Sequence, residues 1–247
     1  MQRYFISTPT TDEEVQLTPD ICHHLIDVMR AQAGTQLELV INHQTVYLAE
    51  LIDPQTGTVK LLETLPNEVE LPLQVTLACG LPKTKDKPEM IVQKATELGA
   101  SQIIFFEAQR SVSHWTNGKE VKKIDRLQKI ANAAAEQSHR IVQPKVTYVK
   151  NLVELIKQNT YDLKVVAWEE SAKQGETTAL VKTLQKAQAG QSLLAVFGPE
   201  GGLTSQEIDQ LAQFQVEPVG LGPRILRTET APLYLMSAIS YQMELFK

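Results

Sequence analysis

The sequence has few cysteines and no long apolar run. Only Cys22 and Cys79 occur in 247 residues, far apart and outside any CxxC pair, which argues against a disulfide framework or a metal site. We expect two reduced, buried thiols and no metal. The apolar run 193–197 is far too short to span a bilayer, and the first residues lack the apolar core of a signal peptide. The expected protein is soluble and cytoplasmic, with no membrane partner.

Positive charge is scarce in the first part of the chain. The net charge is −5, which argues against a general nucleic-acid binder. Up to Glu70 there are 3 basic and 11 acidic side chains, whereas from Leu71 onward there are 21 basic and 18 acidic. This difference predicts two modules, 1–70 and 71–247. A polyanion should contact mainly the second.

The hydrophobic pattern also changes near residue 70. The first part shows short strands at 37–41, 46–51 and 58–62 and one short helix around 21–29, which together favour a small β-barrel. From Leu73 onward strands and helices alternate, and such an α/β pattern predicts a mostly parallel sheet covered on both faces. A last helix near Pro232 should place Met236, Ile239, Met243 and Phe246 on one apolar face.

A glycine-rich turn follows the apolar strand at 193–197. Glycines at the carboxyl end of a strand let the backbone approach a ligand closely. Thr204 and Glu207 have the spacing of a capping box for the next helix, whose first amides could bind an anion or a carboxylate. The alternative is a tight turn that needs glycine only for its geometry. The motif lacks the Lys-Ser/Thr of a phosphate-binding P-loop.

A second loop, 221–231, also follows a short strand and leads into the last helix. It contains two arginines, a glutamate and two threonines between apolar elements. Such a loop could carry catalytic side chains. It could equally form a structural salt bridge that holds the last helix in place.

Four stretches identify a family: KATELG at 94–99, AAAEQSHR at 133–140, GPEGG at 198–202 and LGPRILRTETA at 221–231. With the segment 23–30, they span nearly the whole chain. The chain resembles the ribosomal small-subunit rRNA uridine-N3 methyltransferases, the RsmE branch of the SPOUT class. The resemblance implies a PUA-like β-barrel for RNA recognition at 1–70, and an α/β SPOUT methyltransferase domain with a C-terminal trefoil knot at 71–247.

The resemblance also implies the ligands and partners. The cofactor would be S-adenosyl-L-methionine, the substrate a uridine at position 1498 of 16S rRNA in the small ribosomal subunit, and the assembly a homodimer that completes the site. The implied cofactor-binding residues are Trp168, Gly198, Pro199, Glu200, Gly201, Gly202, Leu221, Gly222, Ile225, Leu226, Thr230 and Ala231. The candidate RNA-binding residues are Arg3, Arg30, His139 and Arg140, although Arg3 and Arg30 could equally form structural ion pairs.

The chemistry of uracil suggests roles for three residues. A neutral uracil N3 carries a proton and has no good lone pair for attack on a methyl sulfonium, so the proton must leave. Glu229 could accept it, while Arg224 or Arg227 stabilises charge on O2 or O4. Two alternatives stay open: a SPOUT enzyme acting on a ribose 2′-oxygen or a guanine nitrogen, and a noncatalytic RNA-binding assembly factor.

Overall fold

The computed structural model describes residues 1–7, 13–66, 68–115, 118–173 and 178–246. The chain forms two compact units, which we call unit 1 (1–70 with 135–143) and unit 2 (71–134 with 144–247). The segment 135–143 therefore belongs to unit 1, whereas the sequence placed it in the second module. Among the described residues, no helix has both the length and the apolar character needed to cross a membrane.

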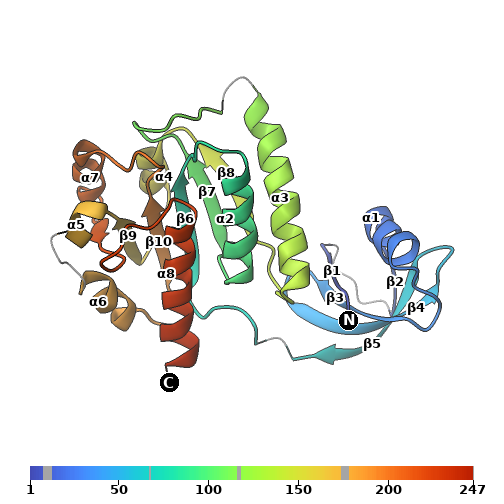
Figure 1. Cartoon of the computed structure of the whole chain (residues 1–247). Helices are drawn as coiled ribbons and strands as arrows, with labels where there is room; N and C mark the ends of the chain where they lie inside the picture. The colour runs from blue at the N-terminus through green and yellow to red at the C-terminus, as the bar shows by residue number, and fades with distance from the viewer. Residues whose placement is uncertain (8–12, 67, 116–117, 174–177, 247) are drawn as a thin grey trace. The chain divides into compact units, whose positions relative to one another are not determined.

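Unit 1 is built on a five-stranded sheet. Its strands are β1 (Arg3–Ile6), β2 (Glu14–Gln16), β3 (Gln36–Ile41), β4 (Thr45–Asp53) and β5 (Thr58–Leu65), in the order β1-β3-β4-β5-β2 (Figure 1). β1 is parallel to β3, and the other pairs are antiparallel. The sheet is a half-barrel with β1 and β2 at its edges, in agreement with the small barrel-like module that the sequence predicted. The predicted helix is α1 (Pro19–Cys22), which continues as the π-helix η1 (His23–Val28).

Two arginines of unit 1 lie in buried ion pairs. Arg3 is 6% exposed and pairs with Glu38 at 2.7 Å. Arg140 donates to Glu70 from Nε at 3.1 Å, and the same carboxylate accepts hydrogen bonds from two backbone amides, those of residues 141 and 142. Arg3 also donates to the Arg140 carbonyl oxygen at 3.2 Å. Because buried charges are stable only when paired, this contact and the Arg140–Glu70 pair fix the segment 135–143 within unit 1.

Unit 2 is built on a six-stranded sheet in which every pair is parallel. Its strands are β6 (Gln74–Gly80), β7 (Gln102–Phe106), β8 (Lys145–Val149), β9 (Leu163–Ala167), β10 (Ser192–Phe197) and β11 (Glu217–Val219), in the order β11-β9-β10-β6-β7-β8. The predicted parallel α/β sheet is confirmed. β10 lies between β9 and β6, so both of its edges are paired.

Helices cover both faces of this sheet, as predicted. One face packs against α2 (Asp86–Glu97), α3 (Lys119–Gln137), α6 (Ala179–Lys186) and α8 (Thr230–Ser240). The other packs against α4 (Leu152–Gln158) and α7 (Ser205–Ala212). The strands alternate between the two cores: Leu77 and Ala195 lie in the first, Ala78 and Val196 in the second. A fully buried leucine or valine contributes roughly 1.5–3 kcal/mol, so both cores stabilise the sheet.

The apolar face of the last helix is shorter than the sequence predicted. Met236 and Ile239 are fully buried and Met243 packs against the same core, which confirms three of the four expected positions. Phe246 is 64% exposed. The reason is a π-helical turn, η2 (Tyr241–Leu245), whose extra residue per turn rotates the following side chain off the face.

A pH-dependent stability is predicted from Glu136, in the part of α3 that belongs to unit 1. Burial raises the pKa of Glu136 to about 7, whereas an unfolded glutamate titrates near about 4.3. Between these values the folded chain binds more protons than the unfolded chain, so the free energy of unfolding falls as the pH rises through this window. Glu136→Gln should abolish the decrease in the free energy of unfolding that the titration of Glu136 causes.

Urea denaturation at pH 5 and pH 8 measures the effect. Asp125→Asn, an exposed change on the same helix, is the matched control and should leave the pH slope unchanged. Equal slopes in wild type and Glu136→Gln would show that Glu136 does not retain its proton in the folded state.

Candidate functional site

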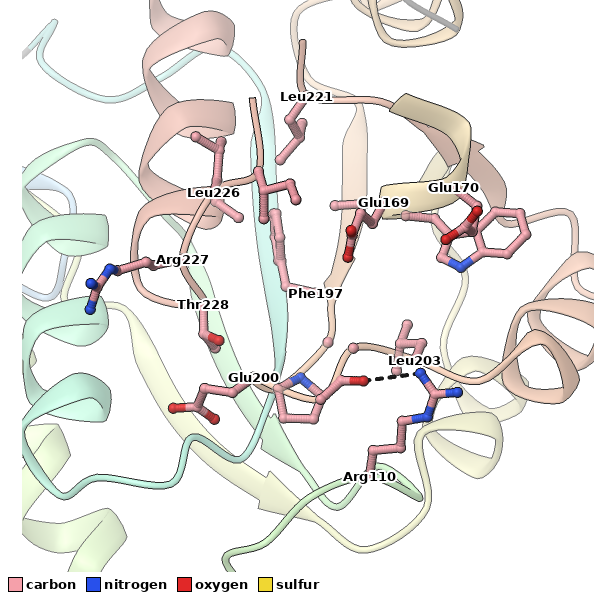
Figure 2. A pocket seen from close by; sticks show the side chains of 18 of the residues that line it. Arg110, Glu169, Glu170, Phe197, Glu200, Leu203, Leu221, Leu226, Arg227 and Thr228 are labelled. Carbon is pink, nitrogen blue, oxygen red and sulfur yellow. Dashed lines mark hydrogen bonds between the residues drawn. The ribbon is translucent and has the colours of Figure 1, made fainter. Parts of the chain in front are cut away.

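A cavity of about 830 Å³ opens at the carboxyl edge of the unit 2 sheet. In a parallel sheet all carboxyl ends meet at one edge, which is where ligands bind in α/β folds. The loops that follow β9, β10 and β11 form its walls (Figure 2). Its lining residues are Lys87, Arg110, Ala167, Trp168, Glu169, Glu170, Phe197, Gly198, Pro199, Glu200, Gly201, Gly202, Leu203, Ser205, Leu221, Pro223, Arg224, Ile225, Leu226, Arg227, Thr228 and Ala231.

The turn after β10 requires glycine for close packing and for backbone conformation. A Cβ at Gly198 would lie 3.0 Å from the Gly202 carbonyl carbon and the Leu203 nitrogen, and Gly202 has φ +68°. The predicted capping box of α7 is confirmed, since the Thr204 side chain accepts from the Glu207 amide and the Glu207 carboxylate accepts from the Thr204 amide. The turn is therefore fixed at both ends.

Arg110, from the loop after β7, also holds the turn after β10 in place. Its Nη1 donates to the Gly201 carbonyl oxygen at 3.1 Å, as the dashed line in Figure 2 shows. A Cβ at Gly201 would lie 2.9 Å from the Arg110 Cβ. The guanidinium is otherwise exposed at the cavity wall, so it holds the turn and places positive charge beside the cavity.

The cavity combines apolar and acidic walls. Figure 2 shows the side chain of Phe197 near the centre, with Leu221 above it and Leu226 to its left. Glu169 and Glu170, at the start of α5 (Glu169–Lys173), lie to the right. An apolar slot beside carboxylates and a glycine turn fits a ligand with a flat aromatic ring, sugar hydroxyl groups and positive charge. S-adenosylmethionine has all three features.

Lys87, in the first turn of α2, joins two loops of the cavity. Its Nζ lies 2.8 Å from Glu200 Oε1 and 3.1 Å from Glu229 Oε2. The hydrogen bond to Glu200, opposed by burial and reinforced by Glu229, raises the pKa of Lys87. Burial favours a higher pKa for Glu200, but hydrogen bonds from Lys87 and backbone amides outweigh it and lower that pKa. Lys87 and Glu200 therefore both carry charge at neutral pH.

The structure brings most of the expected cofactor residues together. All of them line the cavity except Gly222, in the loop after β11, and Thr230, the first residue of α8. Arg224 and Arg227 also line it and are exposed, but Glu229 does not. The Glu229 carboxylate faces Lys87 instead. This geometry favours the alternative in which the loop forms a salt bridge near the start of α8, although the cation is Lys87 and not a loop arginine.

The candidate RNA-binding residues have different environments. Arg3 and Arg140 are buried in the ion pairs of unit 1, so their guanidinium groups are not at the surface. Arg30 is exposed, and His139 is partly exposed with Nδ1 3.0 Å from Glu38 Oε2. Of the two thiols predicted to be buried, Cys79 is fully buried and Cys22 only partly. Burial raises the pKa of Cys79 to about 12. A thiol in that state cannot act as a nucleophile at neutral pH.

Sequence reasoning missed several residues of the site. Lys87, Arg110, Glu170 and Thr228 were not assigned to it. They come from single positions in the segments after β6, β7, β9 and β11. The parallel sheet itself was the available signal, since every loop after a strand reaches the same edge.

Comparison with known proteins gives the class. Residues 69–240 match the family model described as an RNA methyltransferase domain, and residues 17–63 match the one described as an RNA methyltransferase PUA domain. The fold is thus the mixed α/β fold of SPOUT methyltransferases preceded by a PUA-like half-barrel. Its site and these matches define an RNA methyltransferase.

Individual relatives narrow the class to a family. The chain is 45% identical to ribosomal RNA small subunit methyltransferase E of Bacillus subtilis, covering 100% of this chain and 99% of the relative. It is 33% identical to the Synechocystis protein of the same name, covering 93% and 74%. A Neisseria gonorrhoeae structure of that name, bound to S-adenosylmethionine, is 25% identical with a TM-score of 0.81 over 97% of each chain. This protein belongs to the ribosomal RNA small subunit methyltransferase E family.

Gly198→Ala tests the tight turn. The added Cβ would meet backbone atoms at 3.0 Å, so the turn must shift, and we expect affinity for S-adenosylmethionine to fall about tenfold or more. Isothermal calorimetry measures this. Gly190→Ala is the control, because Gly190 has φ +85° in open space away from the cavity; it should lower stability but not affinity. Unchanged affinity in Gly198→Ala would mean that the turn does not contact the ligand.

Proposed function

We propose that this protein transfers a methyl group from S-adenosylmethionine to N3 of a uridine in 16S rRNA, the uridine at position 1498, on the small ribosomal subunit. The observation that carries the proposal is the cavity at the carboxyl edge of the sheet. Three loops of this chain build it, and it lies in a protein with a full-length relative named for the modification of small-subunit rRNA.

The donor site is assigned to the residues that line the cavity. The turn 198–202 supplies close backbone contact, Leu221, Ile225 and Leu226 supply apolar surface, and Trp168 closes the side after β9. When bound, S-adenosylmethionine supplies an activated methyl group. Glu169 and Glu170 favour a cationic ligand by charge.

The acceptor chemistry is assigned to the arginines of the loop after β11. Uracil becomes nucleophilic at N3 when it loses its proton, which solvent water accepts in this assignment, and the negative charge then spreads to O2 and O4. Arg224 and Arg227 line the cavity and are exposed, so they can stabilise that charge. Glu229 was the expected proton acceptor. Because its carboxylate is paired with Lys87 and Glu229 is not among the residues that line the cavity, we assign it a positioning role.

RNA recognition is divided between the units in this proposal: unit 1 positions the RNA and unit 2 supplies most of the charge. Of the four side-chain cations Arg3, Arg30, Lys60 and Arg140, two are buried in ion pairs. Such a surface cannot hold RNA by phosphate contacts alone and is better suited to shape recognition. Arg30 and His139 are the residues we assign to direct contact.

Mapping of modified nucleosides in small-subunit rRNA by mass spectrometry tests the function. We expect loss of one 3-methyluridine when the gene is deleted and its return with the wild-type gene. A lost 2′-O-methyl group or methylguanosine would instead favour another SPOUT target. Absence of S-adenosylmethionine binding in calorimetry would favour a noncatalytic assembly factor.

Arg227→Ala and Arg224→Ala test the charge-stabilising role. Loss of a group that stabilises developing charge lowers kcat by about 10²-fold in comparable sites, and we expect that order for at least one variant on small subunits from the deletion strain. Arg126→Ala is the matched control, because Arg126 is 71% exposed on α3, pairs with Glu89 and is not part of the cavity. Near-normal turnover in both loop variants would remove these arginines from the mechanism.

We further propose a cytoplasmic homodimer that uses the end of the last helix. Tyr241, Leu245 and Phe246 are 57%, 73% and 64% exposed in the single chain, and exposed apolar clusters commonly mark interfaces. Leu245→Glu should shift the mass measured by light scattering from dimer to monomer. Val28→Glu, an equally apolar exposed site in unit 1, should not. A wild-type protein that is monomeric at all concentrations would contradict the assignment.

A further inference from the structure

One ammonium group connects the two sides of the donor cavity. Glu200 belongs to the turn after β10, and Glu229 lies at the start of α8, with α7 and β11 between them in the chain. Lys87 reaches both carboxylates, at 2.8 Å and 3.1 Å. Its side chain is 16% exposed and that of Glu229 is 15% exposed. The contact is therefore partly shielded from water, where ion pairs are stronger than at the surface.

The turn after β10 has a second connection to the same segment. Glu200 accepts the backbone amide of Lys83 with both oxygens, at 3.0 Å and 3.1 Å. Lys83 lies between β6 and α2, just before Lys87. The Glu200 carboxylate thus fixes the turn to the start of α2, and Lys87 extends this connection to the loop 221–229. The side chains of Glu200 and Lys87 thus connect three segments that are distant in the sequence: the start of α2, the turn after β10 and the loop after β11.

We infer that Lys87 is a positioning residue that sets the separation of the turn 198–202 and the loop 221–228, and thereby the width of the donor cavity. This inference rests on the proposed function. Glu229 has the same positioning role, because its carboxylate holds the loop that carries Arg227 and Thr228 and acts through Lys87. Lys87 touches neither the methyl group nor the base in this assignment.

The alternative is that Lys87 binds an RNA phosphate. A phosphate would have to displace two carboxylates that already surround the ammonium group at hydrogen-bonding distance. The charges that interact with Lys87 are the carboxylates of Glu200, Glu229 and the neighbouring Asp86, so the ammonium group is already matched by negative charge. Such surroundings repel a phosphate and favour retention of the lysine.

Lys87→Met tests the inference by leaving two carboxylates face to face without a cation. We expect affinity for S-adenosylmethionine to fall about tenfold or more in calorimetry. Lys87→Arg keeps the charge and can bridge two carboxylates, so its affinity should stay within about threefold of wild type. Lys87→Met/Glu229→Gln removes one of the repelling charges and should recover part of the loss.

The kinetics separate positioning from RNA binding. With Lys87→Met we expect a higher KM for S-adenosylmethionine and an unchanged KM for small subunits, whereas a phosphate ligand would give the reverse. Unchanged donor affinity in Lys87→Met, or no recovery in both Lys87→Arg and the double variant, would overturn the inference.

If Lys87→Met does not fold, as judged by circular dichroism, Glu200→Gln and Glu229→Gln replace it and must each weaken donor binding. A wild type that binds no donor would reject the proposed function, whereas a normal wild type with a normal Lys87→Met would reject only this inference.

Discussion

The position of β10 between β9 and β6 is the constraint on which the rest of unit 2 depends. Both edges of this strand are hydrogen-bonded, and its side chains supply both cores. Its end at Phe197 is therefore fixed within narrow limits, and the glycine turn begins from that point. Because β9 ends next to it and β11 ends beyond β9, three loops meet at one place. The strand order therefore determines where the cavity forms.

Charge is used differently in the two units. In unit 1, Arg3 and Arg140 form internal ion pairs that hold the segment 135–143, which leaves an acidic module with little surface cation. In unit 2, Lys87 is also paired, yet Arg110, Arg224 and Arg227 remain at the cavity wall. Exposed arginines of unit 2 thus lie at the cavity wall, beside its carboxylates, where a polyanionic substrate would approach the donor.

Much of the fold and part of the site could be predicted from the sequence. Apolar strands, the capping box and the glycine turn are local signals, since the residues that interact are neighbours in the chain. Short strands such as β1 and β2 were missed because three or four residues are too few to show a clear hydrophobic period. The pairing of Lys87 with Glu229 joins residues more than a hundred positions apart, and no local pattern encodes it. Phe246 was misplaced because a π turn breaks the helical period.

The discontinuity of unit 1 has a practical meaning for dissecting this protein. A fragment that stops at Glu70 would lack the main-chain oxygens of His139 and Arg140, which accept from Arg3, and would leave the Glu70 carboxylate without its guanidinium partner. Such a peptide would carry one unpaired carboxylate, that of Glu70, and an Arg3 that keeps Glu38 but loses its main-chain acceptors. A fragment that reproduces unit 1 must therefore contain 135–143 joined to 1–70. Loss of activity in the simple 1–70 truncation would reflect the missing segment and not the properties of the intact half-barrel.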